Sequence, residues 1–296
     1  MTAETIAREL GGHKSGAGWM ARCPAHDDRV PSLSISDAPN GKILVHCHAG
    51  CDQHRVIGAL KSLRLWDAVT DSSEVTTRAK PNSNRPSDRD DVDRTERAMQ
   101  IWRASKLGQD TVVESYLRSR GIIIAVPDTL RFHPALKHPT GQVLPAMVSL
   151  VRRGRDGQPI GIHRTFLRHD GAGKAPVEPT RMMLGPCRGG AVQLAAPGEV
   201  LLIGEGIETC LAAMQATGLL AWAALSTSGL RSLDLPKVAE VIILADGDEA
   251  GEAAARSAAR RWRLEKRRVR IAHAPQGYDF NDLLRGLGPK NWKYVA

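Results

Sequence analysis

Short apolar runs alternate with helical patterns over the last hundred residues of the chain. Four runs have the length and the branched apolar content of buried strands: residues 200–203, 221–225, 241–245 and 269–272. The segments 207–217 and 250–264 repeat apolar residues at helical spacing. Strands that alternate with helices predict an α/β fold, in which a parallel sheet carries helices on both faces.

The hundred residues before this region follow a different pattern. Apolar positions recur at helical spacing over residues 99–117, which predicts a helical hairpin. Apolar and polar residues alternate at 144–151 and 161–167, and again around Met182 and Val192, with glycine-rich turns between them. This alternation predicts a small antiparallel subdomain.

The first 67 residues have a short helical segment at each end and strand-like runs at 32–36 and 42–46. The stretch DSSEVTTRAKPNSNRPSDRDDVDR, residues 71–94, contains almost no large apolar residue and cannot bury enough surface to order itself. We therefore expect four parts: a module at 1–67, a flexible linker at 68–93, a small α+β subdomain at 94–195 and the parallel-sheet domain at 196–296.

The composition is that of a globular protein, because 42% of the 296 residues are hydrophobic and 25% are charged. The formal net charge of +9 favours a polyanionic partner such as nucleic acid. The longest apolar stretch, residues 210–225, is shorter than the roughly 20 residues of a membrane span, and the first ten residues lack the features of a secretory signal. We therefore expect a cytoplasmic protein without a membrane partner.

Two pairs of soft ligands lie in the first module. Cys23 and His26 form one pair, and Cys47 and Cys51 form the other. Two such pairs supply the four nitrogen and sulfur ligands that zinc prefers in a tetrahedral site, and a closed site of this kind is structural. Four further histidines are alternatives for the fourth ligand: His13, His46, His48 and His54.

Carboxylates follow two of the predicted parallel strands. Glu205 comes after the first strand, and Asp246 and Asp248 come after the third. Because the carboxyl ends of parallel strands meet at one edge of the sheet, these oxygen ligands could hold Mg²⁺ in one crevice, and Asp279 could join them. A simpler interpretation of Asp248 is a cap at the start of the next helix.

Three parts of the sequence resemble parts of one enzyme family. The order Glu205-Gly206, Asp246-x-Asp248 and Asp279 resembles the Toprim domain of bacterial-type primases, topoisomerases and some nucleases. The segments CPAHDDRVPSLSI and VHCHAGC look like the zinc-binding domain of bacterial and phage primases. The segment HRTFLRHDGAGKAPVEPTRMMLGPCRGGAV is similar to the region before Toprim in primases of phages, plasmids and integrated elements, which points to a mobile element.

The resemblance implies a Rossmann-like Toprim core behind a zinc-ribbon-like module, with Zn²⁺ as a structural ion. It implies catalytic roles for Glu205, Asp246 and Asp248, which with Asp279 would hold Mg²⁺ or Mn²⁺. Lys174 and Arg181 would bind nucleotide phosphates.

Two positions depart from the pattern of the bacterial replicative enzyme. The second zinc pair has the spacing C-x3-C instead of C-x2-C, and Asn281 stands in place of a second Asp. The fourth zinc ligand and the outer metal ion therefore stay open.

Residues 256–270 contain eight Lys or Arg and one acid, a local charge of +7. Arg260, Arg263 and Arg267 of this segment could contact the backbone of single-stranded DNA, although a solvated helix face is an equally good interpretation. We expect Trp262 in the core. The sequence contains no Walker motif, so a separate helicase would be needed as a partner.

The pattern as a whole predicts a DNA primase, a nucleotidyltransferase that makes short RNA primers from ribonucleoside triphosphates on single-stranded DNA. Two alternatives use the same residues. A Toprim-type nuclease would use the acids to hydrolyse DNA, and an inactive zinc-stapled replication factor would only bind single-stranded DNA.

Overall fold

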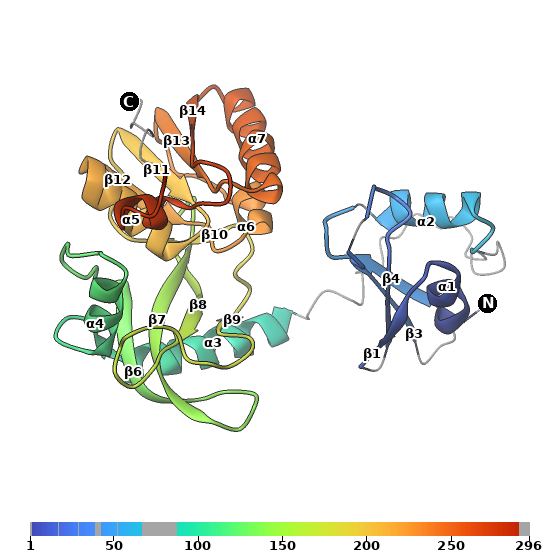
Figure 1. Cartoon of the computed structure of the whole chain (residues 1–296), viewed down its shortest axis with the longest axis horizontal. Coiled ribbons are helices and arrows are strands. Elements are labelled where there is room, and N and C mark those ends of the chain that lie inside the picture. Colours follow the sequence, from blue (N-terminus) through green and yellow to red (C-terminus); the bar gives the residue numbers. More distant parts are fainter. Residues whose placement is uncertain are drawn as a thin grey trace. The chain divides into compact units, whose positions relative to one another are not determined.

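The computed structural model describes residues 2–16, 18–28, 30–38, 43–51, 53–66 and 88–289. The chain divides into two compact units, residues 1–81 and 82–296 (Figure 1). Most of the predicted linker, residues 68–87, lies outside the described residues. Its last residues, 88–93, begin the helix α3 (Asp88–Ala104), so the helix starts earlier than the apolar pattern alone predicts.

The first unit is a small α+β module. Its strands form an antiparallel sheet in the order β1-β2-β3-β4, with α1 and α2 packed against it. The elements are α1 (Ala3–Glu9), β1 (His13–Ser15), β2 (Gly18–Ala21), β3 (Leu33–Asp37), β4 (Ile43–Cys47) and α2 (Gln53–Ser62). Ile6, Leu33, Ile35 and Leu60 are buried at its centre, so the module has a core of its own.

The second unit is built on one ten-stranded mixed sheet. Its main path runs β14-β13-β11-β12-β10-β7-β6-β5, while β8 pairs with β7 and β9 pairs with β8. The strands are β5 (Lys106–Leu107), β6 (Leu130–Lys137), β7 (Val143–Arg153), β8 (Pro159–Phe166), β9 (Arg181–Leu184), β10 (Gly190–Gln193), β11 (Val200–Gly204), β12 (Leu220–Ala223), β13 (Glu240–Ala245) and β14 (Arg268–His273). The helices after α3 are α4 (Val112–Ser119), α5 (Ile207–Thr217), α6 (Thr227–Ser232), α7 (Glu249–Leu264) and α8 (Phe280–Leu284).

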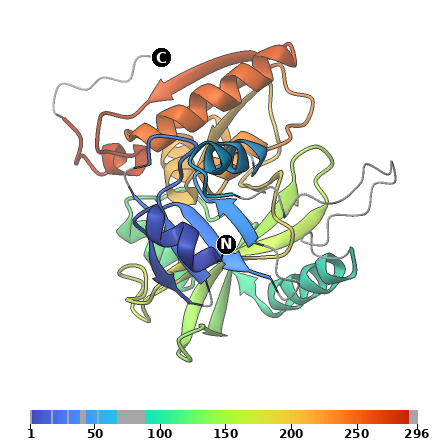
Figure 2. The same cartoon turned by 90° about the vertical axis from the view of Figure 1, so that its right-hand side faces the viewer.

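Strands β12, β11, β13 and β14 are parallel and carry helices on both faces, as the alternation of runs predicts. Leu202 and Leu244 point to the core under α5 and α8. Ile203 and Ile243 point to the opposite core, under α6 and α7. Trp262 of α7 is fully buried there, as expected, and Figure 2 shows α7 running beside β14. The mixed α/β fold is therefore confirmed.

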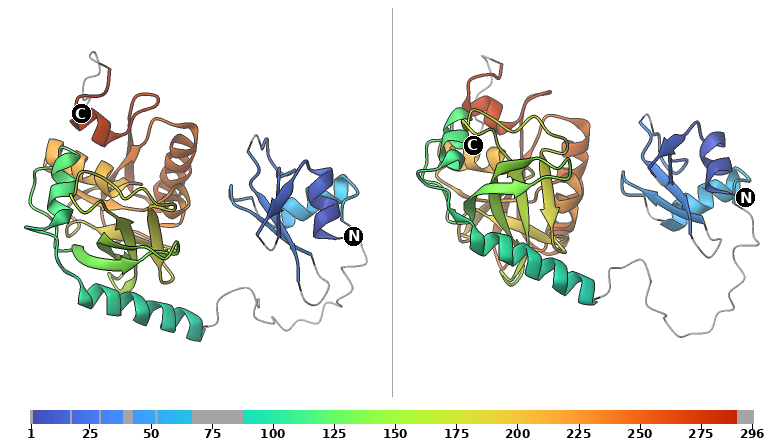
Figure 3. Two further views of the ribbon diagram at one scale, coloured as in Figure 1. Left: turned by 60° about the horizontal axis from the view of Figure 1, so that its bottom comes forward. Right: turned by 90° about the horizontal axis from the view of Figure 1, so that it is seen from below.

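The antiparallel strands do not form a separate sheet. Val192 of β10 pairs with Ala223 of β12 and with Val151 of β7, so β10 joins the antiparallel half to the parallel half. The predicted helical hairpin is wrong, because α3 packs mainly against β8 and extends over β9, β6 and β7, whereas α4 packs against β6 and β7 and is not paired with α3. Figure 3 shows α3 as the long helix that lies across the antiparallel strands. The short strand β5 separates the two helices.

In the described part of the chain, no helix has the length and the apolar character needed to cross a membrane.

Candidate functional site

The acids predicted to act together lie at the carboxyl ends of two neighbouring strands. β11 ends at Gly204, immediately before Glu205, and β13 ends at Ala245, immediately before Asp246. These two strands are parallel partners, with Ile203 opposite Ile243. The register therefore brings Glu205 and Asp246 to the same edge of the sheet.

Two close backbone contacts fix the loops that carry these acids. Gly247 donates its N–H to the carbonyl oxygen of Tyr278 over 2.9 Å. A Cβ atom at Gly247 would lie 1.9 Å from the carbonyl oxygen of Pro275, so only glycine fits there. This contact holds the loop after β13 against the loop that leads to Asp279.

The acids line a cavity of about 430 Å³ that also holds basic side chains. Its lining residues are Arg120, Lys174, Arg181, Glu205, Gly206, Glu208, Leu225, Ser226, Thr227, Asp246 and Asp279. Leu225 has a φ of 72°, in the left-handed region that a branched side chain rarely adopts. Strained backbone of this kind concentrates at functional sites, and here the N–H of Leu225 bonds to the carbonyl oxygen of Glu205 over 2.9 Å.

Glu205 and Asp246 are half-buried, and each has one buried carboxylate oxygen without a hydrogen-bond partner. Oε1 of Glu205 and Oδ1 of Asp246 are both inaccessible to solvent and accept no hydrogen bond from the described residues. Burial raises the pKa of Glu205 to about 7, and the charge of Asp248 adds to this. Burial also raises the pKa of Asp246 to about 7, together with the charges of Asp279, Glu205 and Asp248. Such a set of hard, unsatisfied oxygens fits a divalent cation.

The other two predicted acids, Asp248 and Asp279, each cap a helix. Asp248 caps α7, because its side chain accepts the N–H of Gly251 over 2.7 Å. Asp279 caps α8 and shares a capping box with Asp282, whose N–H lies 2.8 Å from Oδ1 of Asp279. Asp248 therefore caps the helix, as its simpler interpretation predicts, and its charge acts on Glu205 and Asp246, while its side chain is not among those that line the cavity.

The two residues expected to bind phosphate lie in the same cavity as the acids. Nζ of Lys174 is 3.3 Å from Oε1 of Glu208, a buried acid that the sequence analysis does not single out. The hydroxyl of Tyr116 donates to the same oxygen. Burial alone would raise the pKa of Glu208, but Lys174, Tyr116 and Arg181 lower it to about 2.

The basic helix lies away from this cavity. α7 begins beside Asp246 and runs back along the sheet, which places Arg260 roughly 16 Å from the start of the helix at 1.5 Å per residue. Arg263 donates to the carbonyl oxygen of Val269 over 3.0 Å.

Arg267 is not available for DNA. Its guanidinium donates to the carbonyl oxygens of Pro236, Val238 and Leu235 at 2.7, 2.9 and 3.4 Å, and its side chain is only 14% exposed. The structure corrects the predicted DNA contact of Arg267, because these bonds tie β14 to the loop after α6.

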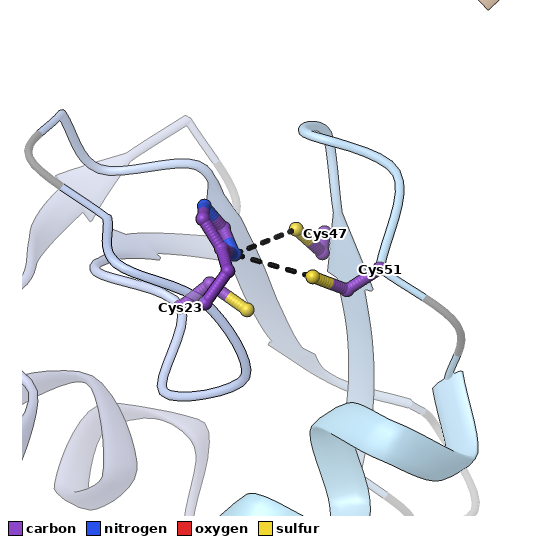
Figure 4. Close-up of side chains that lie close together, drawn as sticks. Cys23, Cys47 and Cys51 are labelled. Carbon is purple, nitrogen blue, oxygen red and sulfur yellow. Dashed lines mark hydrogen bonds between the residues drawn. The ribbon is translucent and has the colours of Figure 1, made fainter. Parts of the chain in front are cut away.

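The four predicted zinc ligands come together in the first unit (Figure 4). The ligand atoms of Cys23, His26, Cys47 and Cys51 all lie within 4.8 Å of one another. Nδ1 of His26 is 3.2 Å from the sulfur of Cys51 and 4.0 Å from that of Cys47. Three sulfurs and one nitrogen at this spacing fit a zinc ion.

Asp28 supports this cluster and is missed by the sequence analysis. Its Oδ2 accepts the N–H of Cys23 over 2.6 Å and the hydroxyl of Ser32 over 2.7 Å. Its Oδ1 lies 3.6 Å from Nε2 of His26, on the side of the ring away from the cysteines. A carboxylate behind a ligating histidine fixes the orientation of the ring. An acid two residues after a Cys-x-x-His pair is a signal that could have found it.

Burial raises the pKa of the Cys23 thiol, with Cys47 and Cys51 adding to the effect. Burial would also raise the pKa of Cys47, but hydrogen bonds from the Cys51 backbone and the Ser32 hydroxyl lower it below its ordinary value. Among the alternative histidines, His46 and His48 are exposed and stack edge-to-face at 4.9 Å, outside the cluster. The side chain of His54 lies outside the described residues.

Residues 200–290 match the family of Toprim domains. The chain contains a Toprim domain. Its boundaries enclose Glu205, Asp246, Asp248 and Asp279, so all four predicted acids are Toprim residues. Residues 92–194 match a domain of unknown function, DUF7146, which contributes Tyr116, Arg120, Lys174 and Arg181 to the same cavity or its wall. No curated protein matches the sequence.

Solved structures of primases are similar to this chain at low identity. The zinc-binding and RNA polymerase domains of the Aquifex aeolicus primase are 20% identical, with a TM-score of 0.45 over 96% of this chain and 79% of that one. A DNA primase domain from Pseudomonas aeruginosa is 18% identical, with a TM-score of 0.44 over 66% and 75%. The primase fragment of the bacteriophage T7 primase-helicase is 14% identical, with a TM-score of 0.40 over 90% and 95%.

Proposed function

We propose that this protein is a DNA primase, which joins ribonucleotides into short primers on single-stranded DNA. One observation carries the proposal: Toprim acids with unsatisfied buried oxygens, Glu205 and Asp246, line the same cavity as the cations Lys174 and Arg181. Acids that bind metal, placed opposite cations that bind phosphate, are what nucleotidyl transfer requires. We further propose the domain organisation expected from the sequence, with a zinc module at 1–67, a linker at 68–93, a subdomain at 94–195 and the Toprim domain at 196–296.

In this proposal Glu205, Asp246, Asp248 and Asp279 hold one or two divalent cations. Mg²⁺ or Mn²⁺ bound there would activate the attacking 3′-hydroxyl and stabilise the charge that develops on the leaving pyrophosphate. Glu205 directly precedes the N-cap of α5 and would be the acid nearest to the nucleotidyl-transfer chemistry.

Lys174, Arg181 and Arg120 would bind the triphosphate. Each lines the cavity, and Arg120 lies directly after α4, where its carbonyl oxygen accepts the amide of Asn281 over 2.8 Å. Guanidinium groups bind phosphate oxygens in pairs and ammonium groups bind them as point charges. Because these cations come from the DUF7146 region, we propose that this region is the nucleotide-binding half of the site.

The Cys23, His26, Cys47 and Cys51 cluster would hold a structural Zn²⁺ that staples the first module. A module of this size has a small core, and a closed metal site supplies stability that the core lacks. We propose that the zinc module helps to bind the single-stranded template and that Arg260 and Arg263 add phosphate contacts. A separate helicase would supply unwinding.

The test is incorporation of labelled ribonucleotides on single-stranded DNA without a primer, with Mg²⁺ or Mn²⁺. We compare the wild type with Asp246→Asn and with the control Asp234→Asn, which makes the same change at an exposed position outside the cavity. The proposal predicts short template-dependent products from the wild type and the control, and a loss of at least 100-fold in Asp246→Asn, typical for removal of a group that stabilises the transition state (roughly 10²–10³).

Two results would contradict the proposal. Metal-dependent cutting of the template without added nucleotides would identify a Toprim nuclease. Retention of DNA with no turnover, both alone and with a replicative helicase added, would indicate a binding factor.

A further inference from the structure

Glu208 is a buried acid that the proposed chemistry does not use. It lies in the first turn of α5, three residues after Glu205, and only 7% of its surface is exposed. A carboxylate in such a place is costly unless it is paired and hydrogen-bonded. The role of Glu208 therefore depends on the groups that bond to it.

The partners of Glu208 come from two other parts of the fold. The hydroxyl of Tyr116, on α4, donates to Oε1, and Nζ of Lys174 lies 3.3 Å from the same atom. Lys174 sits in the loop between β8 and β9, where it pairs with Leu167 in an isolated bridge. Glu208 therefore ties this loop and α4 to the Toprim helix α5.

The bonding of Glu208 differs from that of the metal-binding acids. Oε1 of Glu205 is buried with no hydrogen-bond partner among the described residues, whereas Oε1 of Glu208 already has two partners, one of them a cation. An oxygen that is satisfied in this way is poorly suited to bind a metal ion. Its position at the cavity wall, beside Lys174, suits it to hold a cation in place.

We infer that Glu208 is a positioning residue that holds the ammonium of Lys174 at the cavity wall, where it meets the nucleotide phosphates. This inference rests on the proposed function. The lysine side chain is 32% exposed, so without its partner the ammonium would turn toward water and leave the cavity. Glu205, just before the N-cap of α5, and Glu208, in its first turn, would then have two roles, since the first acid would bind the metal and the second would fix the lysine.

The test is a double-mutant cycle on ATP binding by the zinc-loaded full chain, measured by calorimetry with no other metal added. The cycle compares the wild type, Glu208→Gln, Lys174→Met and the double variant. We expect Glu208→Gln to weaken ATP binding about fivefold to tenfold, and to change it less than twofold when Lys174 is already replaced, because coupling requires residues that touch. Glu114→Gln is the matched control, since Glu114 pairs with Arg118 on α4 and does not line the cavity.

Five results would overturn the inference. Unchanged ATP binding in Glu208→Gln, an equal change in both lysine backgrounds, or tighter binding would each show that Glu208 does not act through Lys174. A loss of Mn²⁺ affinity as large as that in Asp246→Asn would make Glu208 a metal ligand instead. If Lys174→Met binds ATP like the wild type, the phosphate role in the proposed function fails as well.

A second variant guards against misfolding. Tyr116→Phe removes the hydroxyl that donates to Oε1 of Glu208, and so loosens the carboxylate that holds Lys174. If Glu208→Gln does not fold, Tyr116→Phe should weaken ATP binding measurably when Lys174 is present and not when it is absent. If Tyr116→Phe changes ATP binding by the same factor with and without Lys174, the inference is overturned.

Discussion

Three acids that line the cavity of the second unit differ in their partners. Glu208 has a cation and a hydroxyl beside it, and its pKa falls to about 2. Glu205 and Asp246 lack such partners, and burial raises the pKa of each to about 7. A residue that stays charged through its neighbours is typical of a fixed scaffold, whereas unsatisfied acids in a cavity are typical of a site that gains its partner from outside.

The buried side chain of His163 provides a test at the scale of a single residue. It is 5% exposed, and burial lowers its pKa to about 4; the positive charges of Arg181, Lys174 and Arg164 also lower it, while Glu208 opposes them. The unfolded chain binds a proton at His163 below about pH 6.5, whereas the folded chain does so only near pH 4. Stability should therefore be complete above pH 6.5 and decrease as the pH falls, by up to about 3 kcal/mol.

Urea unfolding at a series of pH values between 4 and 8 measures this effect. His163→Gln should flatten the slope between pH 4 and 6.5, and the exposed control His169→Gln should keep it. Equal slopes in the wild type and His163→Gln would show that other groups cause the pH dependence.

The buried side chain of Asn281 links α8 to the end of α4. Asn281 has no exposed surface, and its amide donates to the carbonyl oxygen of Arg120 over 2.8 Å. An aspartate could not donate this hydrogen bond. The asparagine that departs from the pattern of the bacterial replicative enzyme therefore has a structural reason, because it holds the end of α4 and its Arg120 beside Asp279.

Asn281→Asp should destabilise the second unit by about 2–4 kcal/mol, because it removes a donor and buries a charge without a partner. The new charge would also lie two residues from Asp279. Chemical denaturation measures the loss, and Gln142→Glu is the control because it adds the same charge at an exposed turn. A variant as stable as the wild type would show that the link between α4 and α8 contributes little.

The elements that the sequence predicts best are long and strongly patterned. Helix α5 spans the predicted residues 207–217, and α7 begins one residue before the predicted 250–264. The short helices α6 and α8 are missed, since five or six residues give too little periodicity. The prediction of a helical hairpin is wrong because the apolar spacing indicates that each helix buries one face. It does not indicate which element packs against that face.

Some features of the site also follow from the sequence pattern, whereas others do not. The strand-end rule predicts that Glu205 and Asp246 meet in one cavity, because the carboxyl ends of parallel strands lie at one edge of the sheet, and Asp279 joins them from the N-cap of α8. The contact between Tyr116 and Glu208 joins residues 92 positions apart in the sequence, and no local sequence pattern predicts it. Arg267 is misjudged because a run of basic residues does not reveal which guanidinium groups bond to backbone carbonyls.

At the scale of the whole molecule, each unit carries one ligand set of its own. The first unit gathers soft sulfur and nitrogen ligands suited to zinc, and the second gathers hard oxygens suited to Mg²⁺ or Mn²⁺. Both sets sit next to a separate hydrophobic core. The soft ligand set would therefore hold a metal ion that shapes the first module, and the hard ligand set would hold metal ions that perform chemistry.

The most direct test of this account is Mn²⁺ binding to the zinc-loaded full chain, followed by electron paramagnetic resonance at pH 8. We predict that the wild type and Asp234→Asn bind one or two Mn²⁺ ions and that Asp246→Asn binds them at least tenfold more weakly. Mn²⁺ affinity that is equal in Asp246→Asn and the wild type would contradict the assignment of the Toprim acids as the metal centre.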